Sequence, residues 1–265
     1  MRQVRLGRVL LLLLVAFAAA AGAASPAAAF SPATQRAIAQ EAARLAPPDL
    51  ARQMERHRKE LAAGAAAPFR DGDPGRHVKN ADGSGQLDRV IAAEVERAVE
   101  MIRAHRPFAE VVRQLGVVSH FVADANSPLN ASAADPREAS YFSDYLHYVE
   151  AALPRFPLVF YGLDPRLDGD CGLGAFVART LERSRRLYPL IGEEYRRVSF
   201  LPGAEAFDDR STAFGVSSLA FSYAVNDVAR VLRHAWLAAG GADERRGLVL
   251  AADRRLRLPR ATAGR

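Results

Sequence analysis

The chain has 265 residues, of which 49% are hydrophobic, 25% charged and 8% aromatic, and its formal net charge is +6. This composition excludes a disordered, collagen-like or polytopic membrane protein, and the length is sufficient for one large domain with its own core. Arg2, Arg5 and Arg8 precede every acidic residue, so a chain that begins at Phe30 carries 33 basic and 30 acidic groups, a net charge of +3. That charge is too small to indicate nucleic-acid binding by itself. Cys171 is the single cysteine, which excludes an internal disulfide and a cysteine-cluster metal site.

Residues 1–29 are typical of a secretory signal peptide. A short basic stretch, Met1–Arg8, is followed by the uncharged apolar run Val9–Gly22 and by small residues that end at Ala29. An uncleaved N-terminal anchor is the alternative, but the strongly apolar part is short for a bilayer span. We therefore expect cleavage after Ala29 and a mature protein that is secreted or periplasmic.

Hydrophobic periodicity predicts an all-α protein, with about seven helices packed as a single bundle-like domain over residues 30–241. No segment alternates between apolar and polar residues for long enough to indicate a sheet. Residues 242–265 are rich in arginine and are expected to form a loosely ordered tail. The predicted helices are two short ones within 31–62, then 87–104, 108–125, 137–153, 176–197 and 211–239, with a glycine-rich loop over 63–86.

The predicted helix Phe108–Ala125 carries the strongest sign of chemistry. It is apolar on nearly every side, yet it includes His120 and Asp124, whose spacing of four places both side chains on one face. Burying these two groups is unfavourable unless a partner satisfies them, and a divalent metal would do so. Gly116, one turn before His120, leaves space beside that face. An ordinary ion pair at a helix end is the alternative, and the H-x-x-x-D spacing alone favours it.

Two further groups of polar residues offer possible ligands. The group on the predicted helix 137–153 has a spacing of three, which indicates either a metal site or a solvated helix face. The group in the glycine-rich loop 63–86 is, by itself, more typical of a polar turn. These groups are Asp144, His147 and Glu150 on the predicted helix 137–153, and Asp71, Asp73 and His77 in the glycine-rich loop.

Taken in chain order, these segments resemble the zinc-dependent phospholipase C and single-strand-specific nuclease superfamily. The stretch LGVVSHFVADANSPLN, from Leu115 to Asn130, is similar to the family pattern L-G-x-x-x-H-x-x-x-D-x-x-x-P-L-H. The loop GAAAPFRDGDPGRHVKN resembles the family's aspartate-then-histidine loop, and FDDRSTAFGVSSLAFSYAVNDVARVLRHAWLAAGG resembles the C-terminal helices of bacterial members. The resemblance spans about 30–241 and implies an all-helical secreted fold with up to three zinc ions.

Carried over residue by residue, the resemblance implies a first zinc site and a catalytic carboxylate. The first zinc would be held by His77, His120, Asp124 and Asp71, with Asp73 as the alternative to Asp71. Asp71 would also orient or deprotonate the attacking water. The resemblance implies further metal ligands at Phe30, through its amine and carbonyl, and at Asn130, His147 and Glu150.

The chain departs from the family pattern at the second and third sites. Asn130 stands where the family has the histidine of P-L-H, and His147 precedes Glu150 by three residues instead of four. Phe30 replaces a tryptophan, and Gln35 replaces the histidine that follows it in the nuclease branch. These departures leave one well-supported zinc site, one impaired site and one doubtful site.

With zinc bound, the expected chemistry is hydrolysis of a phosphodiester, most readily of a phospholipid, by a monomer that contacts a membrane surface. One alternative is a catalytically impaired relative that binds a metal or another ligand without turnover. Another is a secreted single-strand nuclease, which needs exposed aromatic rings to stack bases. Tyr141, Phe142 and Tyr145 are the aromatic residues near the expected site, although core packing explains them equally well.

Overall fold

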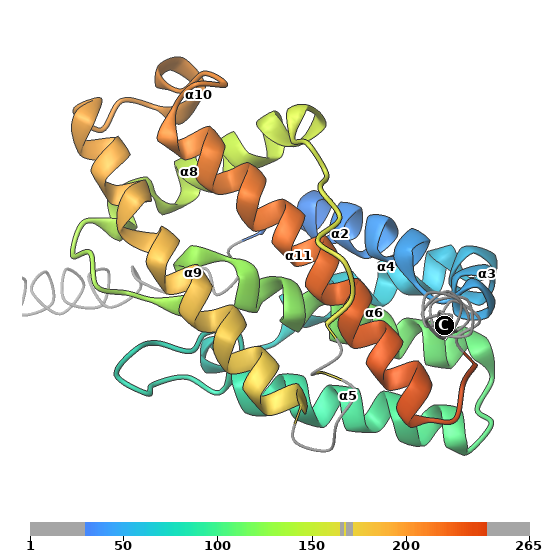
Figure 1. Ribbon diagram of the computed structural model, residues 1–265. Coiled ribbons are helices and arrows are strands. Elements are labelled where there is room, and N and C mark those ends of the chain that lie inside the picture. Colours follow the sequence, from blue (N-terminus) through green and yellow to red (C-terminus); the bar gives the residue numbers. More distant parts are fainter. Residues whose placement is uncertain (1–29, 165–166, 168–171, 243–265) are drawn as a thin grey trace, which may run out of the picture.

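The computed structural model of the chain describes residues 30–164, 167 and 172–242 (Figure 1). Within these ranges every regular element is a helix, so the predicted all-α class is confirmed. The predicted signal peptide (1–29) and the predicted tail from residue 243 onwards lie outside the described residues. The helices are α2 (Pro32–Leu45), α3 (Pro48–Arg56), α4 (Arg58–Ala66), α5 (Leu87–Arg103), α6 (Phe108–Asn126), α7 (Pro128–Ala131), α8 (Glu138–Ala152), α9 (Gly172–Arg197), α10 (Gly203–Ala206) and α11 (Thr212–Ala238), with 3-10 turns η1 (Ala67–Arg70), η2 (Pro74–Arg76) and η3 (Leu153–Arg155).

The described part of the chain contains more helices than the seven predicted. The segment 31–62 divides into three helices, because His57 leaves the helical path with φ −110° and ψ 35° between α3 and α4. Helix α4 and the two turns that follow it also extend helical structure into the predicted loop 63–86. Helix α9 begins at Gly172, four residues before its predicted start. In each case tertiary packing overrides the weak local preference of the sequence.

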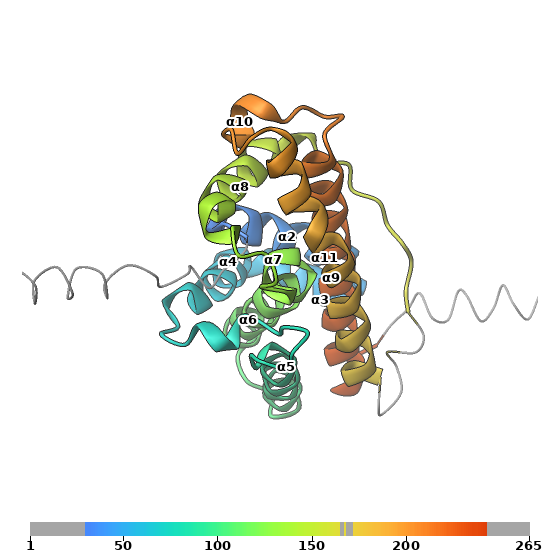
Figure 2. The same cartoon turned by 90° about the vertical axis from the view of Figure 1, so that its left-hand side faces the viewer.

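Helix α6 lies at the centre of the fold and packs against α2, α4, α5, α9 and α11 (Figures 1 and 2). From Val111 to its end at Asn126, nearly all of its residues are buried. Helices α9 and α11 run beside each other along one flank of it, with α5 on another (Figure 2). A polar side chain on the second half of α6 is therefore surrounded by protein. Among the described residues, no helix is long and apolar enough to cross a bilayer.

Helices α4 and α6 approach each other closely at two glycines. A Cβ atom added to Gly116 would lie 2.8 Å from the backbone nitrogen of Ala65 and 2.9 Å from the Cα of Gly64, closer than real Cβ contacts. Because neither glycine has a side chain, the two backbones touch. The space that Gly116 was expected to leave beside His120 is therefore occupied by the backbone of α4 and is not left open.

We predict that Gly116→Ala lowers the free energy of unfolding by about 1–3 kcal/mol, because the atoms it meets are backbone atoms that cannot move aside. Urea denaturation of the purified chain measures this change. Gly215→Ala is the matched control: Gly215 lies in α11 with nothing within 4 Å of an added Cβ. That change should leave stability equal or raise it by up to about 1 kcal/mol. Equal stability of Gly116→Ala and the wild type would contradict the close approach.

Candidate metal centre

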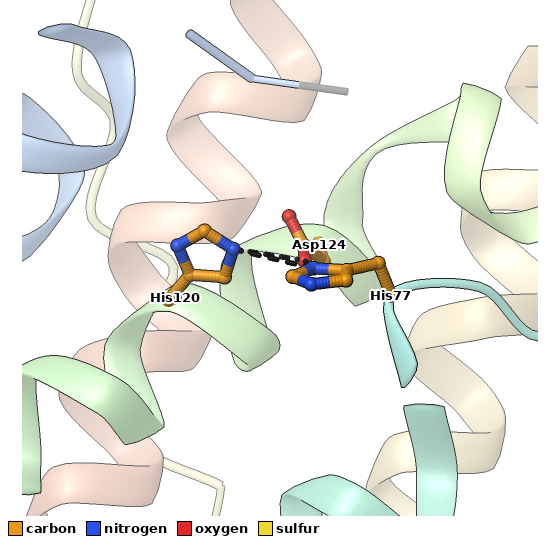
Figure 3. Close-up of side chains that lie close together, drawn as sticks. All are labelled: His77, His120 and Asp124. Atoms are coloured by element: carbon orange, nitrogen blue, oxygen red, sulfur yellow. Dashed lines mark hydrogen bonds and ion pairs between the residues drawn. The ribbon is translucent and has the colours of Figure 1, made fainter. Parts of the chain in front are cut away.

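Three buried side chains from two distant segments meet beside the second half of α6 (Figure 3). His120 and Asp124 lie one turn apart on α6, and His77 comes from the loop that follows η2. Their exposed fractions are 0%, 0% and 2%. One ligand atom from each residue lies within 4.8 Å of the others, so the three could hold a metal ion. We call these residues the triad.

Local hydrogen bonds fix the backbone on both sides of His77. Asp73 caps η2 by accepting a hydrogen bond from the backbone N–H of Gly75 at 2.8 Å. After His77, the backbone N–H of Lys79 donates to the carbonyl of Asn130 at 2.9 Å, which ties the loop to α7. The loop is therefore anchored to the segment directly after α6, and His77 is held against that helix.

The distances within the triad match a tetrahedral zinc site in part. The His120 Nε2 atom lies 3.3 Å from Asp124 Oδ2 and 3.4 Å from His77 Nδ1. Two ligands of a tetrahedral zinc with bonds of about 2.0–2.1 Å are separated by about 3.3–3.4 Å. The third distance, 2.7 Å between His77 Nδ1 and Asp124 Oδ2, is that of a hydrogen bond. The donor set and its spacing therefore fit zinc after a small movement of one ring.

The orientation of the His120 ring directs Nε2, with its lone pair in the neutral form, towards Asp124 and His77. Its Nδ1 lies 2.8 Å from the carbonyl oxygen of Ala65 on α4, which can only accept, so Nδ1 carries the proton and donates. In a neutral ring, Nε2 is then an acceptor that faces Asp124 Oδ2, which is also an acceptor. That pair of atoms requires a proton or a cation between them. A ring nitrogen that donates to a backbone carbonyl is also the usual support of a metal-binding histidine.

The pKa values of His120 and Asp124 are shifted in opposite directions. Burial alone would lower the pKa of His120, but the charge of Asp124 and the hydrogen bonds to Asp124 and Ala65 raise it above its ordinary value of 6.5. Burial would likewise raise the pKa of Asp124, but the charges and hydrogen bonds of His120 and His77 hold it below its ordinary value of 3.8. The centre therefore favours a negative carboxylate with positive charge beside it.

Asp71 is a fourth polar group beside the triad and, unlike it, reaches solvent. Its side chain is 27% exposed, and its Oδ2 lies 4.0 Å from His77 Nε2. The same oxygen accepts a hydrogen bond of 2.8 Å from Arg76, whose side chain also pairs with the buried Glu94 at 3.1 Å. Asp73 instead caps η2. Of the two loop aspartates, Asp71 is therefore the one near His77, but it faces Nε2 and not the Nδ1 atom that meets Asp124. Asp71 is not part of the group that could hold a metal, so its expected role as a fourth ligand of the first zinc finds no support.

Sequence reasoning missed the contributions of Arg76 and of Gln35. The only signal for Arg76 was its place directly before His77. Gln35 was considered only as the replacement for a family histidine, yet its side-chain amide on α2 donates to Asp124 Oδ1 at 2.9 Å.

The structure does not bring His147 and Glu150 to the triad. Both side chains are exposed on α8: their spacing of three places them on one face, and that face is turned to solvent. Asp144, one turn earlier, accepts hydrogen bonds from the hydroxyl of Tyr195 and the backbone N–H of Gly203, which is a structural role. Within the described ranges, the triad is the only group of three or more His, Cys, Asp or Glu side chains close enough to hold a metal. The resemblance-based expectation of ligands on this helix therefore finds no support.

Phe30 and Asn130 are both buried but lie outside the triad. Phe30 belongs to the hydrophobic core just before the Ser31 cap of α2. Asn130 lies in α7, where its side-chain nitrogen has no hydrogen-bond partner. The aromatic residues considered for base stacking, Tyr141, Phe142 and Tyr145, are also buried in the core. These rings therefore offer no stacking surface to a nucleic acid.

None of the three triad residues lines any of five surface cavities with volumes of about 370–630 Å³. Asp71 and Arg76 are the nearby charged groups that reach solvent, with side-chain exposures of 27% and 32%.

The chain matches no known protein family, and no curated protein is similar enough to count as a relative. A proposal of function therefore depends on the geometry of the centre and on the motif resemblance described above.

We predict that the stability of the metal-free protein falls with rising pH, whereas the additional stabilisation by zinc grows. Without metal, the raised pKa of His120 stabilises the fold fully below pH 6.5, and this contribution is lost as the pH rises through the folded-state pKa. Zinc competes with the same proton, so the stabilisation by zinc grows over that range. Thermal denaturation between about pH 6 and about pH 9, with chelator or with zinc, measures both trends. Zinc stabilisation that stays constant with pH would contradict the role of His120 as a ligand.

Proposed function

We propose that the protein is a zinc-dependent phosphodiester hydrolase that acts on phospholipids in the manner of a phospholipase C. The observation that carries this proposal is the buried triad of His77, His120 and Asp124, with the carboxylate of Asp71 beside it. Two imidazoles and one carboxylate are a ligand set that zinc enzymes use, with a fourth position left for water or substrate.

Each residue has a distinct part in this proposal. A bound zinc ion supplies Lewis-acid polarisation of a phosphoryl oxygen and lowers the pKa of water. In this proposal Asp71, whose Oδ2 lies 4.0 Å from His77 Nε2 and whose side chain reaches solvent, accepts a proton from an attacking water. Arg76 adds positive charge at the same exposed edge, where an anionic phosphate would approach.

The preference for a phospholipid comes from the resemblance of residues 207–241 to the C-terminal helices of bacterial phospholipase C-like proteins. In this proposal the protein is exported through its N-terminal signal peptide, acts in the periplasm or outside the cell as a monomer, and contacts a membrane surface. A nucleic acid is the less favoured substrate, because Tyr141, Phe142 and Tyr145, the aromatic residues considered for base stacking, are buried.

A second candidate function is a structural metal centre in a relative without catalytic activity. The specific observation in its favour is the near-complete burial of all three triad side chains. Structural zinc sites are closed to solvent, whereas catalytic ones keep an open position. In this alternative the ion ties the loop of His77 to α6, and removing it destabilises the fold without any effect on hydrolysis.

We predict that the purified chain contains zinc, and that His120→Ala loses it because one of three protein ligands is gone. Metal analysis of both proteins measures the content. His57→Ala is the matched control, since this histidine lies between α3 and α4 and outside the triad. Full zinc content in His120→Ala would refute the ligand assignment.

We predict that Asp71→Asn keeps its zinc but hydrolyses a chromogenic phosphodiester about 10²–10⁴-fold more slowly, as expected for loss of a general base. Release of diacylglycerol from phosphatidylcholine vesicles tests the lipid preference. Zinc-loaded wild-type protein without activity on either substrate would exclude the hydrolase and leave the structural centre.

A further inference from the structure

Gln35 makes the third contact with the buried carboxylate of Asp124. It lies on α2, far from α6 in sequence, and its side chain is fully buried. Its Nε2 donates a hydrogen bond of 2.9 Å to Asp124 Oδ1 and lies 3.5 Å from the carbonyl oxygen of His120.

The orientation of the Gln35 amide follows from chemistry. A flipped amide would place its oxygen against a carboxylate oxygen, and both atoms are acceptors. In the orientation found, the Gln35 Oε1 atom is buried without a hydrogen-bond partner. A buried acceptor without a hydrogen-bond partner destabilises the folded state. The hydrogen bond from Nε2 to Asp124 therefore sets the orientation of the Gln35 side chain, and this orientation leaves Oε1 without a partner.

Gln35 and the histidines divide the two oxygens of Asp124 between them. Oδ1 accepts from Gln35, whereas Oδ2 faces His77 Nδ1 at 2.7 Å and His120 Nε2 at 3.3 Å. A carboxylate that bridges two metal ions needs one oxygen for each ion. The N–H of Gln35 occupies the position where a second ion would approach Oδ1.

We propose that Gln35 is a positioning residue that limits the centre to one metal ion and directs Asp124 Oδ2 towards it. This inference rests on the zinc binding proposed above and is independent of hydrolysis. It agrees with the exposed positions of His147 and Glu150, which leave no second cluster of ligands within the described residues.

The test uses zinc alone as the probe. The full chain is stripped with a chelator and titrated with zinc against a chromogenic competitor, and bound ions are counted by native mass spectrometry. We expect one zinc per wild-type chain. Gln35→Met keeps the length of the side chain but removes the donor, so zinc affinity should fall about 10–100-fold. Gln40→Met is the matched control, because Gln40 is exposed on the same helix.

A spectroscopic readout separates positioning from a purely structural role. Cobalt(II) in place of zinc reports the geometry of its ligands through its visible absorption, and we expect this spectrum to change in Gln35→Met. A purely structural role would lower the thermal midpoint of the metal-free variant and leave the cobalt spectrum unchanged, which would refute positioning by Gln35.

The remaining outcomes distinguish this inference from the proposed function. Two or more zinc ions per wild-type chain would overturn the limit to one ion, whether or not the variant folds. One zinc bound with equal affinity by wild type and Gln35→Met would overturn the role of Gln35 alone. A wild-type chain that binds no zinc would overturn the proposed function together with this inference.

Discussion

The buried negative charge of Asp124 is the constraint on which the rest of the structure depends. A carboxylate with no access to water must be matched by donors or by a cation, since its desolvation is otherwise strongly unfavourable. In this protein the partners are Gln35 on α2, His120 on α6 and His77 in the loop after η2. Segments far apart in the chain are thereby brought to one point, so the centre contributes to the tertiary fold as well as to any chemistry.

The close contact of α4 and α6 connects the packing of the core to the state of the centre. Gly64 and Gly116 allow the two backbones to touch, and this places the carbonyl of Ala65 where it accepts from His120 Nδ1. That hydrogen bond sets which ring nitrogen of His120 faces the carboxylate. A change in helix packing would therefore alter the ligand properties of His120 without any substitution at the centre itself.

Burial of the triad and exposure of its neighbours have different consequences. The enclosed ligands favour tight, specific binding of an ion, because bulk water does not compete for them. Asp71 and Arg76 join this enclosed centre to the surface and carry opposite charges. In the proposed hydrolase with a single ion, charge stabilisation of a phosphate would come from that ion and from Arg76, whose charge is shared with Asp71 and Glu94.

The sequence by itself determined the features that arise from local geometry. The 3.6-residue period identified the helical class and most of the long helices, and the spacing of four placed His120 and Asp124 on one face of a buried helix. Helix ends at prolines were also predictable, as at Pro107 before α6. These features depend on residues within a few turns of one another, which is why a single sequence is sufficient for them.

Only the tertiary structure decided which other groups join the centre. His77 lies 43 residues before His120. Its arrival depends on the path of a loop whose Lys79 N–H donates a hydrogen bond to the carbonyl of Asn130 in α7. The hydrogen bond of Gln35 to Asp124 and the outward position of His147 likewise follow from the way whole helices pack, and no local spacing encodes that packing. The physical reason is that burial and contact are properties of the assembled core, whereas periodicity is a property of each helix alone.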